Sequence, residues 1–418
     1  MGRRFNIAMV AACPFPTAQG SQVFIRQLAE ALHTRGHRVH LVTYHLSEPG
    51  CRTRLPVVRT RPLPGYAKLR SGPAIGKPLL DFFLAIQLAT LVRGGEIDII
   101  HAHNYEAALA AFLIGKRWRI PVIYHAHTIF EEELPTYFPF MLLKAGARWL
   151  GRQLDSFAPR RMDRCLAITS PMLCRLLERG VQREKIDLLP PGIFYEEPRE
   201  EWIHQVGRSY SLDEKSTVLY AGNLDNYQRV DLLLEAFEEV RARCADAVLL
   251  IVTNSNPKKH RRLVERLRLD ESVRFLTGLT FDKVSAIMAC CHVAVLPRLL
   301  PYGLPIKLLN YMAAGMPVVA FRRAGHILDH LQTGYLVSEE GAHGLADGIV
   351  ALLTDRQLAA ELGANARKVA GTHFDWEDRI VSLESIYENV IFQTQGRRPP
   401  LHNPQESIGQ EEPLARHW

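Results

Sequence analysis

The chain has 418 residues, of which 47% are hydrophobic and 23% charged, and its formal net charge is +7. This length exceeds one comfortable hydrophobic core and predicts two domains of roughly 150–200 residues each. No window of about 18 uninterrupted apolar residues occurs, which argues against a transmembrane helix. The seven cysteines are scattered and odd in number, which argues against a disulfide framework and predicts a cytoplasmic protein.

Short apolar runs alternate with helical patterns through the first half of the chain. The predicted strands are residues 6–12, 38–44, 97–103, 121–127, 164–170 and 185–192. Helices are predicted between them, for example over residues 21–37 and 106–118. Strands rich in β-branched residues that alternate with helices are typical of a parallel sheet covered on both faces.

A second series of the same kind starts near Ser216. Its predicted strands are residues 217–224, 247–254, 273–278, 292–297 and 317–321. The two series predict an α/β chain with two doubly wound domains, whose ligand-binding loops at the carboxyl ends of the strands line a cleft between them. The predicted parts are an N-terminal domain over 1–195, a C-terminal domain over 196–375, a helix over 376–395 that packs back on the first domain, and a disordered tail over 396–418.

Two common nucleotide-binding motifs do not occur in the sequence. No G-x-G-x-x-G follows the first strand, and there is no Walker A motif. These absences weaken the dehydrogenase and kinase interpretations. The first strand is followed instead by "ACPFPTAQGSQVF", a loop with two prolines and one glycine, Gly20, that opens a helix.

The stretch "YGLPIKLLNYMAAGMPVVAF", residues 302–321, combines a loop, a helix and the start of a strand. Pro305 suits the first turn of the helix, and Gly315 suits its C-terminal end. The question is whether the helix is only a buried element or whether a ligand lies at its front end.

The start of this helix has the properties of a phosphate site. The backbone N–H groups of Gly303, Leu304 and Ile306 lack intrahelical partners, and the aligned peptide dipoles place partial positive charge there. Gly303 would let a phosphate approach the backbone closely. Lys307 and Asn310 are three residues apart and share one face of the helix. Ordinary helix capping is the alternative interpretation.

This stretch resembles the nucleotide-sugar signature of family 4 (group 1) glycosyltransferases, in which an acidic residue is followed after seven residues by a Glu, around "GLP" and "EAMAxGxPVVA". Most of the chain shares the resemblance. "VLYAGNLDNYQRVDLLLEAF" is similar to the family's "GRL…KGVDLLLEAF", "LLPPGI" to its "PNGV", and "FDWEDRIVSLESIY" to its closing "W…Y" helix. "AACPFPTAQGSQVFIRQLAEAL" is similar to the glycine-containing loop of the family's N-terminal domain.

The resemblance implies a GT-B fold, with two facing Rossmann-like domains and a cleft between them. It implies that the C-terminal domain binds a nucleoside-diphosphate sugar and the N-terminal domain an acceptor, with retention of anomeric configuration. It implies no metal ion and no cofactor besides the donor substrate. Cations and helix-end donors would stabilise the charge on the departing diphosphate.

Four expected polar residues differ from the family pattern. The Arg that follows the glycine, here Gly222, is replaced by Asn223, and the family's Lys position falls on Gln228. The ribose-binding Glu becomes Asn310, and the first acidic residue becomes Tyr302. Asn310 can still hydrogen-bond a ribose hydroxyl, although more weakly than a carboxylate.

Other basic residues could supply the positive charge that the family's Arg and Lys provide. We expect Arg229, Arg298 and Lys307 to supply it. The four changes also fit a catalytically degenerate nucleotide-sugar-binding protein of the same fold. A sugar-nucleotide epimerase, which needs no acceptor, is a further alternative. The basic N-terminal half and the closing helix favour transfer.

Four histidines lie at the ends of two predicted strands, in "HAHN" and "YHAHT". They are His101, His103, His125 and His127. His127 matches the family's His near the reacting centre and is expected to contact the transferred sugar and the donor phosphate. The alternatives are ordinary polar residues at strand ends and a zinc site. We predict no metal site, and we expect Gly20 to lie near the donor phosphate or the acceptor.

The positive charge is concentrated in the N-terminal half. Residues 51–164 contain 17 Lys and Arg but 9 Asp and Glu, a net charge of +8. There the basic residues interleave with apolar runs, "KPLLDFFLAIQLATL" and "FPFMLLKAGARWLGRQL". This pattern is consistent with docking on an anionic membrane and equally with two amphipathic core helices.

The sequence therefore predicts a metal-independent, retaining hexosyltransferase that uses a UDP- or GDP-sugar. Its predicted acceptor is a lipid-linked or cell-envelope glycan, with peripheral association at the inner face of the membrane and no nucleic-acid partner. The predicted catalytic residues are His127, Lys307 and Asn310. The predicted donor-binding residues are Gly20, Gly222, Asn223, Gln228, Arg229, Arg298, Tyr302, Gly303, Leu304 and Pro305.

Overall fold

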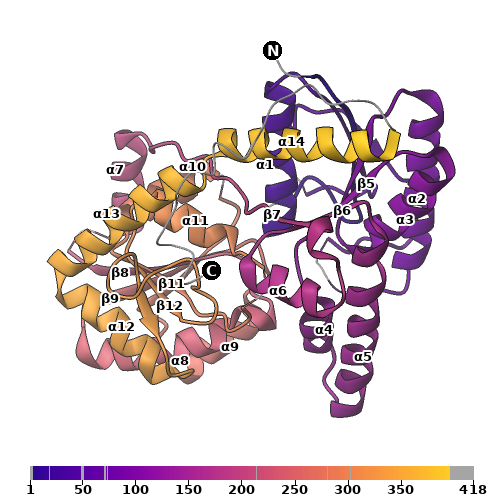
Figure 1. Ribbon diagram of the computed structural model, residues 1–418. Helices are drawn as coiled ribbons and strands as arrows, with labels where there is room; N and C mark the ends of the chain where they lie inside the picture. Colours follow the sequence, from indigo (N-terminus) through magenta and orange to yellow (C-terminus); the bar gives the residue numbers. More distant parts are fainter. Residues whose placement is uncertain are drawn as a thin grey trace. The chain divides into compact units, whose positions relative to one another are not determined.

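The computed structural model of the protein describes residues 3–17, 19–48, 51–69, 72, 74–212, 214–279, 281–301 and 303–395. The predicted tail over 396–418 and Tyr302 lie outside these residues. The chain divides into two compact units (Figure 1). Among the described residues, the N-terminal unit runs to Gly192 and also includes Gly303, Leu304 and the chain from Trp376 to Gln395. The C-terminal unit comprises Ile193–Pro301 and Pro305–Asp375.

The N-terminal unit is built on a parallel sheet that has seven strands within the described residues, in the order β3-β2-β1-β4-β5-β6-β7. The strands are β1 (Asn6–Ala11), β2 (Arg38–Thr43), β3 (Val57–Arg59), β4 (Ile99–His103), β5 (Val122–Ala126), β6 (Arg164–Ala167) and β7 (Ile186–Leu188). The helices are α1 (Gly20–Thr34), α2 (Lys77–Gly94), α3 (Tyr105–Trp118), α4 (Phe130–Glu133), α5 (Met141–Phe157), α6 (Ser170–Glu178) and α14 (Trp376–Gln395), with 3₁₀ turns η1 (Leu134–Tyr137), η2 (Pro159–Arg161) and η3 (Arg183–Lys185).

The C-terminal unit has the same construction on a sheet of six parallel strands within the described residues, in the order β10-β9-β8-β11-β12-β13. The strands are β8 (Ser216–Ala221), β9 (Ala247–Val252), β10 (Val273–Leu276), β11 (Val293–Leu296), β12 (Val318–Phe321) and β13 (Tyr335–Val337). The helices are α7 (Glu200–Ser209), α8 (Val230–Arg243), α9 (Lys258–Arg266), α10 (Phe281–Cys290), α11 (Ile306–Ala313), α12 (Ala342–Thr354) and α13 (Arg356–His373), with the 3₁₀ turn η4 (Asn226–Gln228).

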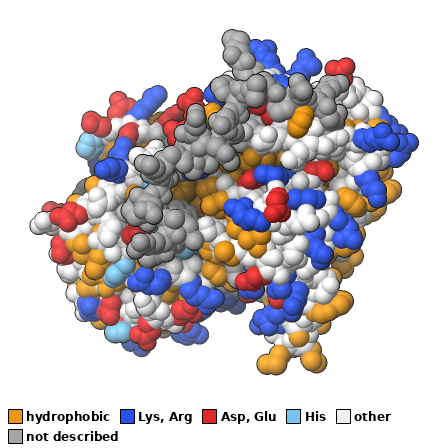
Figure 2. Space-filling model, in the orientation of Figure 1, with side chains coloured by type: hydrophobic (Ala, Val, Ile, Leu, Met, Phe, Trp, Pro, Cys, Tyr) orange, Lys and Arg blue, Asp and Glu red, His pale blue; other side chains and the backbone are white. Residues whose placement is uncertain are grey.

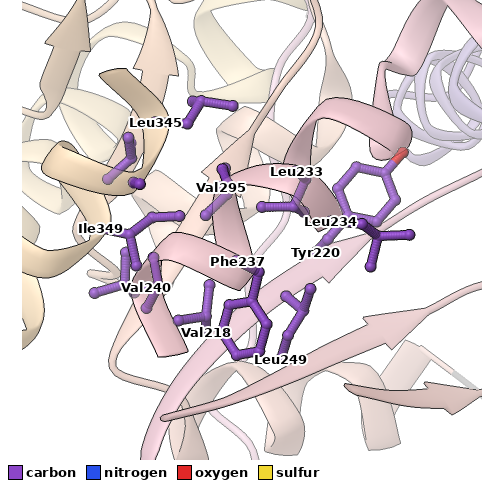
Figure 3. Close-up of a cluster of buried hydrophobic side chains, with 14 of the residues drawn as sticks. Val218, Tyr220, Leu233, Leu234, Phe237, Val240, Leu249, Val295, Leu345 and Ile349 are labelled. Carbon is purple, nitrogen blue, oxygen red and sulfur yellow. The ribbon is translucent and has the colours of Figure 1, made fainter. Parts of the chain in front are cut away.

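The core of the C-terminal unit shows why these strands read as continuous apolar runs. Phe237 and Leu233 of α8 pack with Val218 of β8 and Leu249 of β9, and all four side chains are fully buried (Figure 3). Leu345 and Ile349 of α12 belong to the same buried cluster. Strands covered by helices on both faces have no solvent side, so they lack the alternation of half-exposed strands.

The predicted doubly wound α/β class is confirmed. In each sheet the strand order reverses beside the first strand, between β1 and β4 and between β8 and β11. Ligands of such sheets bind at the carboxyl ends of the strands at this switch point. None of the helices in the described ranges reaches the length and apolar content that a bilayer span requires.

The helix predicted after "YGLP" is α11, and its two ends can be compared with the sequence signals. Gly315 follows the helix end with a φ of +69°, the left-handed conformation that favours glycine at this place. Pro305 was predicted in the first turn, but it lies one position earlier, as the residue that precedes the helix. Its backbone is extended, with a ψ of 111°, so Ile306 becomes the first helical residue.

Candidate functional site

Lys307 lies in the first turn of α11 and points to the end of β8. Its Nζ donates hydrogen bonds to the hydroxyl of Tyr220, at 2.9 Å, and to Oε1 of Gln228, at 3.0 Å. The same nitrogen lies 4.1 Å from the centroid of the Tyr220 ring. Lys307, a predicted catalytic residue, and Gln228, a predicted donor-binding residue from a distant part of the sequence, are therefore in direct contact.

Gly222 makes room for the lysine. Its φ is +153°, and a Cβ atom at this position would lie 2.4 Å from Nζ of Lys307. Tyr220 completes the arrangement, because its hydroxyl donates to the backbone oxygen of Asn223 at 2.6 Å while it accepts from the lysine. Sequence reasoning missed Tyr220, since an aromatic residue inside a predicted strand looks like any other core residue.

The environment of Lys307 disfavours its charged form. Burial lowers the pKa of Lys307 well below its ordinary value, and the nearby Arg298 guanidinium lowers it further, whereas Asp225 acts in the opposite direction. Arg298 itself is 7% exposed, and its guanidinium carbon lies 5.8 Å from the ring centroid of Tyr227. A bound anion would relieve the repulsion between the two cations and would favour protonated Lys307.

The remaining predicted donor residues differ in their surroundings. Asn223 donates to the hydroxyl of Tyr227 at 3.2 Å. Arg229 has a φ of 53° and pairs with Asp231 at 3.3 Å. The structure does not bring Arg229 to Lys307 by any contact that it shows within the described residues. Asn310 is half-buried one turn after Lys307, and its side chain makes no hydrogen bond to another described residue.

The loop before α11 has a conformation that requires glycine. Gly303 has a φ of +78°, and a Cβ atom there would lie 3.0 Å from the backbone oxygen of His127. Both residues belong to the N-terminal unit. Leu304 is buried. Tyr302 lies outside the described residues, so its predicted role is not addressed by the structure.

The four histidines form one cluster in the N-terminal unit. His101 and His103 lie on β4, His125 lies on β5, and His127 follows β5. His101 pairs with His125, with Nε2 and Nδ1 3.2 Å apart, and His103 pairs with His127, with Nδ1 and Nε2 2.9 Å apart. Phe24 of α1 packs edge-on against His125 and His127, with ring centroids 5.0 Å apart in both cases.

The C-terminal helix of the chain reaches this cluster. The hydroxyl of Tyr387 on α14 lies 2.6 Å from Nδ1 of His101, and its ring packs edge-on against Phe5. Tyr387 is the final residue of the "W…Y" segment that the sequence singled out. Its histidine partner is 286 positions away in the chain and could not be identified from the sequence.

Burial keeps these imidazoles neutral. Burial lowers the pKa of His101 and of His127 to about 3, and the neighbouring histidine adds to the effect on His101. The pKa values of His103 and His125 lie well below the ordinary value, first because of burial and then because of the other histidines. At neutral pH the cluster therefore offers neutral hydrogen-bond donors and acceptors rather than cations.

A metal ion is a poor fit to the cluster in this arrangement. Nitrogen atoms of His101, His103 and His125 lie within 4.8 Å of one another. However, the rings stack with interplanar angles of 13–26°, and a lone pair lies in the plane of its ring, so parallel rings do not aim their nitrogens at one point. Nε2 of His101 and Nδ1 of His125 are joined to each other, whereas the buried Nε2 atoms of His103 and His125 have no hydrogen-bond partner among the described residues. The stacked rings and the two His–His pairs favour a hydrogen-bonded cluster over the converging ligands of a zinc ion. The absence of a metal ion stays a prediction.

Gly20 is the first residue of α1, directly after the loop that follows β1. A Cβ atom at this position would meet no other atom within 4 Å. The backbone there is open, as an approaching ligand would require. Its predicted role near the donor phosphate or the acceptor stays a prediction.

Two family models match the chain. Glycosyltransferase Family 4 matches residues 18–197, and Glycosyl transferases group 1 matches residues 215–355. The D-inositol 3-phosphate glycosyltransferase of Pseudarthrobacter chlorophenolicus is 26% identical to the chain over 396 residues, which cover 89% of the chain and 91% of that protein.

Solved structures resemble the whole molecule. Sucrose-phosphate synthase from Thermosynechococcus elongatus has a TM-score of 0.77 at 20% identity, and the match covers 93% of this chain and 100% of that one. Anabaena HepE, solved in complex with UDP and glucose, has a TM-score of 0.72 at 16% identity, with 92% and 100% covered. These likenesses confirm the predicted GT-B fold class.

Proposed function

Because the chain belongs to glycosyltransferase family 4, we propose that this glycosyltransferase moves a hexose from a nucleoside-diphosphate sugar to a lipid-linked or envelope glycan. We propose further that transfer retains the anomeric configuration and needs no metal ion. The donor class is supported by a structural relative that was solved with UDP and glucose. The acceptor class is supported by the basic and apolar surface of the N-terminal unit.

The observation that carries the donor proposal is the position of Lys307. Its Nζ atom lies between two neutral partners, Tyr220 and Gln228, at the N-terminal end of α11. Arg298 is close enough to disfavour its charge. Two cations and a helix N-terminus at one place are complementary to a diphosphate. Gly222 leaves space for the lysine to reach that place.

These groups would act on the leaving group. When the bond between the sugar C1 and the diphosphate oxygen breaks, the sugar becomes oxocarbenium-like and negative charge grows on the diphosphate. Lys307, Arg298 and the helix N–H groups would hold that charge in a preorganised site. His127, which is neutral, would hydrogen-bond the transferred sugar without adding positive charge beside the developing cation. Asn310 would hydrogen-bond a ribose hydroxyl.

A thermal-shift screen with UDP, GDP and ADP tests the donor class, since a bound nucleotide raises the unfolding midpoint of the protein. We expect a shift with UDP or GDP and slow release of the nucleoside diphosphate from the matching sugar donor. The release should persist in excess chelator if no metal is required. No shift and no release with any of these donors would refute the proposal.

A catalytically degenerate binder is the second candidate, because Asn223, Gln228 and Asn310 replace charged residues of the family pattern. Asn310→Glu distinguishes the two. A charged hydrogen bond to a ribose hydroxyl exceeds a neutral one by about 1 kcal/mol, so nucleotide affinity should rise about fivefold. If the protein is an active enzyme, release of the nucleoside diphosphate from the sugar donor is measurable both in the unchanged protein and in Asn310→Glu.

Nucleotide affinity and release of the nucleoside diphosphate are also measured for two further variants. Asn365→Glu adds the same charge on α13, where Asn365 is exposed, and should leave nucleotide affinity unchanged. Gln228→Lys should remove the hydrogen bond from Lys307 to residue 228, because it replaces the acceptor Oε1 with a second cation. Tighter binding in Asn310→Glu without release in either protein would favour the degenerate binder.

A further inference from the structure

The first half of α5 exposes its large apolar side chains. Phe140, Met141 and Leu142 are 68%, 85% and 86% exposed, and Trp149 is 65% exposed. Leu143 also lies mostly in solvent. Side chains of this size are costly to leave in water, at roughly 25 cal/mol for each Å² of apolar surface. A contiguous group of them marks a surface that contacts something else.

This exposure follows from how the helix is held. The buried residues of α5 are Ala147, Gly151 and Asp155, spaced four apart along one narrow stripe. α4 crosses at Gly151, where a Cβ atom would lie 2.5 Å from the backbone oxygen of Phe130. The ten residues before this crossing extend roughly 15 Å, and the free end of α5 projects beyond α4 (Figure 1).

Positive charge accompanies the apolar surface. Lys144, Arg148 and Arg152 are spaced four apart and form a second stripe on α5, and all three are exposed. The only acidic residue of the helix, Asp155, is buried and accepts from the backbone N–H groups of Phe130 and Glu131. Figure 2 shows apolar side chains at the free end of α5 with Lys and Arg side chains directly above them.

A second exposed apolar stripe lies on and before α2 but carries less positive charge. Ile75, Leu79, Phe82 and Ile86 are all exposed. The basic residue at the start of α2, Lys77, is engaged by Glu106. The two segments that the sequence left open as membrane-docking candidates therefore differ. Among the described residues, α5 joins its exposed apolar residues with three cations that make no ion pair, whereas α2 has one such cation, Arg93, in its last turn.

We propose that the free end of α5 docks on an anionic lipid surface, with Leu142, Leu143 and Trp149 in the headgroup region. Lys144, Arg148 and Arg152 lie at the level of the lipid phosphates. An apolar helix face flanked by cations is the pattern of interfacial helices, and anionic lipids complement the cationic stripe. The inference deepens the proposed acceptor class, because the docked surface would bring the enzyme to a lipid-linked substrate.

Vesicle co-sedimentation of the full chain, without donor or acceptor, tests the proposal. We expect binding to phosphatidylcholine vesicles that contain phosphatidylglycerol and much weaker binding to phosphatidylcholine alone. Each cation removed should weaken binding about fivefold, so Lys144→Gln, Arg148→Gln and Arg152→Gln together should weaken it about a hundredfold. Leu142→Ser with Leu143→Ser should weaken it more than tenfold.

Phe82→Ser on α2 is the matched control, since it removes an exposed apolar side chain without nearby free charge and should leave binding unchanged. Equal binding to both vesicle types, or loss of binding in Phe82→Ser alone, would overturn the proposal. A concentration-dependent dimer that the α5 changes abolish, without vesicle binding, would assign the surface to a second copy of the chain. Nucleotide binding by every variant, measured by thermal shift, separates failure of docking from failure of the proposed donor chemistry.

Discussion

Replacing Lys307 by Met should lower kcat by about 10²–10³-fold while the protein stays folded, because one preorganised donor to the leaving group is lost. Met has a similar length and fills the space between Tyr220 and Gln228, so the change removes the cation with little change in packing. Release of the nucleoside diphosphate from the sugar donor, with the acceptor present, measures the effect. UDP affinity should also fall, since a charged hydrogen bond to phosphate is lost.

Lys258→Met provides the comparison. Lys258 is an exposed lysine on α9 of the same unit, and its loss should leave kcat within a factor of about two, as expected for a surface residue away from the site. If Lys307→Met retained full activity, the diphosphate would have to bind elsewhere. The lowered pKa of Lys307 in the free protein adds a second readout. An anion should draw a proton onto the lysine, so nucleotide affinity should fall as pH rises.

The sequence identified several residues of the candidate donor site but not the contacts between them. Lys307 was identified because it follows the "GLP" loop at a helix start, and helix-start signals are local. Tyr220 was missed because its contact with Lys307 joins residues 87 positions apart. Nothing in the run "VLYA" distinguishes a tyrosine that holds a lysine from one that only packs. The contact depends on the order of β8 and β11 in the sheet, which one sequence does not fix.

The histidine cluster shows the same limit. Two pairs of histidines were predicted at the ends of two strands. The register that sets His103 opposite His125, and the arrival of Tyr387 from α14, are long-range features. Without them the sequence predicted no metal site but did not show how the four histidines contact one another. The stacked rings favour a hydrogen-bonded cluster over converging metal ligands.

The sequence pattern also left undecided whether the apolar side chains of α5 are exposed to solvent. "FPFMLLKAGARWLGRQL" has the composition of an amphipathic core helix as well as of a membrane-docking one. Only the narrow contact along Ala147, Gly151 and Asp155 shows that its apolar residues face solvent. Periodicity identifies which residues share a helix face, but the neighbours of that face come from the tertiary structure.

Mild acid should destabilise the N-terminal unit strongly, because its histidines are buried as neutral groups. His101, His103 and His125 are fully buried, and their pKa values are lowered, to about 3 for His101 and well below the ordinary value for the other two. In the unfolded chain each titrates near pH 6.5. Between the pKa values of the folded and the unfolded state, the unfolded chain binds more protons than the folded protein, so the free energy of unfolding falls as pH falls.

The expected slope is large. Each histidine contributes about 1.4 kcal/mol per pH unit, so these three contribute about 4 kcal/mol for every pH unit below about 6. His127, whose pKa is lowered in the same direction, adds to this slope. Urea midpoints of the N-terminal unit at a series of pH values, followed by hydrogen exchange of β4 and β5, measure this slope. His103→Gln removes one titrating group and should reduce the slope by about 1.4 kcal/mol per pH unit. The slope depends on the number of protons taken up on unfolding, so a variant that is merely less stable would keep the same slope. If the free energy of unfolding of the unchanged protein did not vary with pH, the folded cluster would take up protons as readily as the unfolded chain, and the prediction would be wrong.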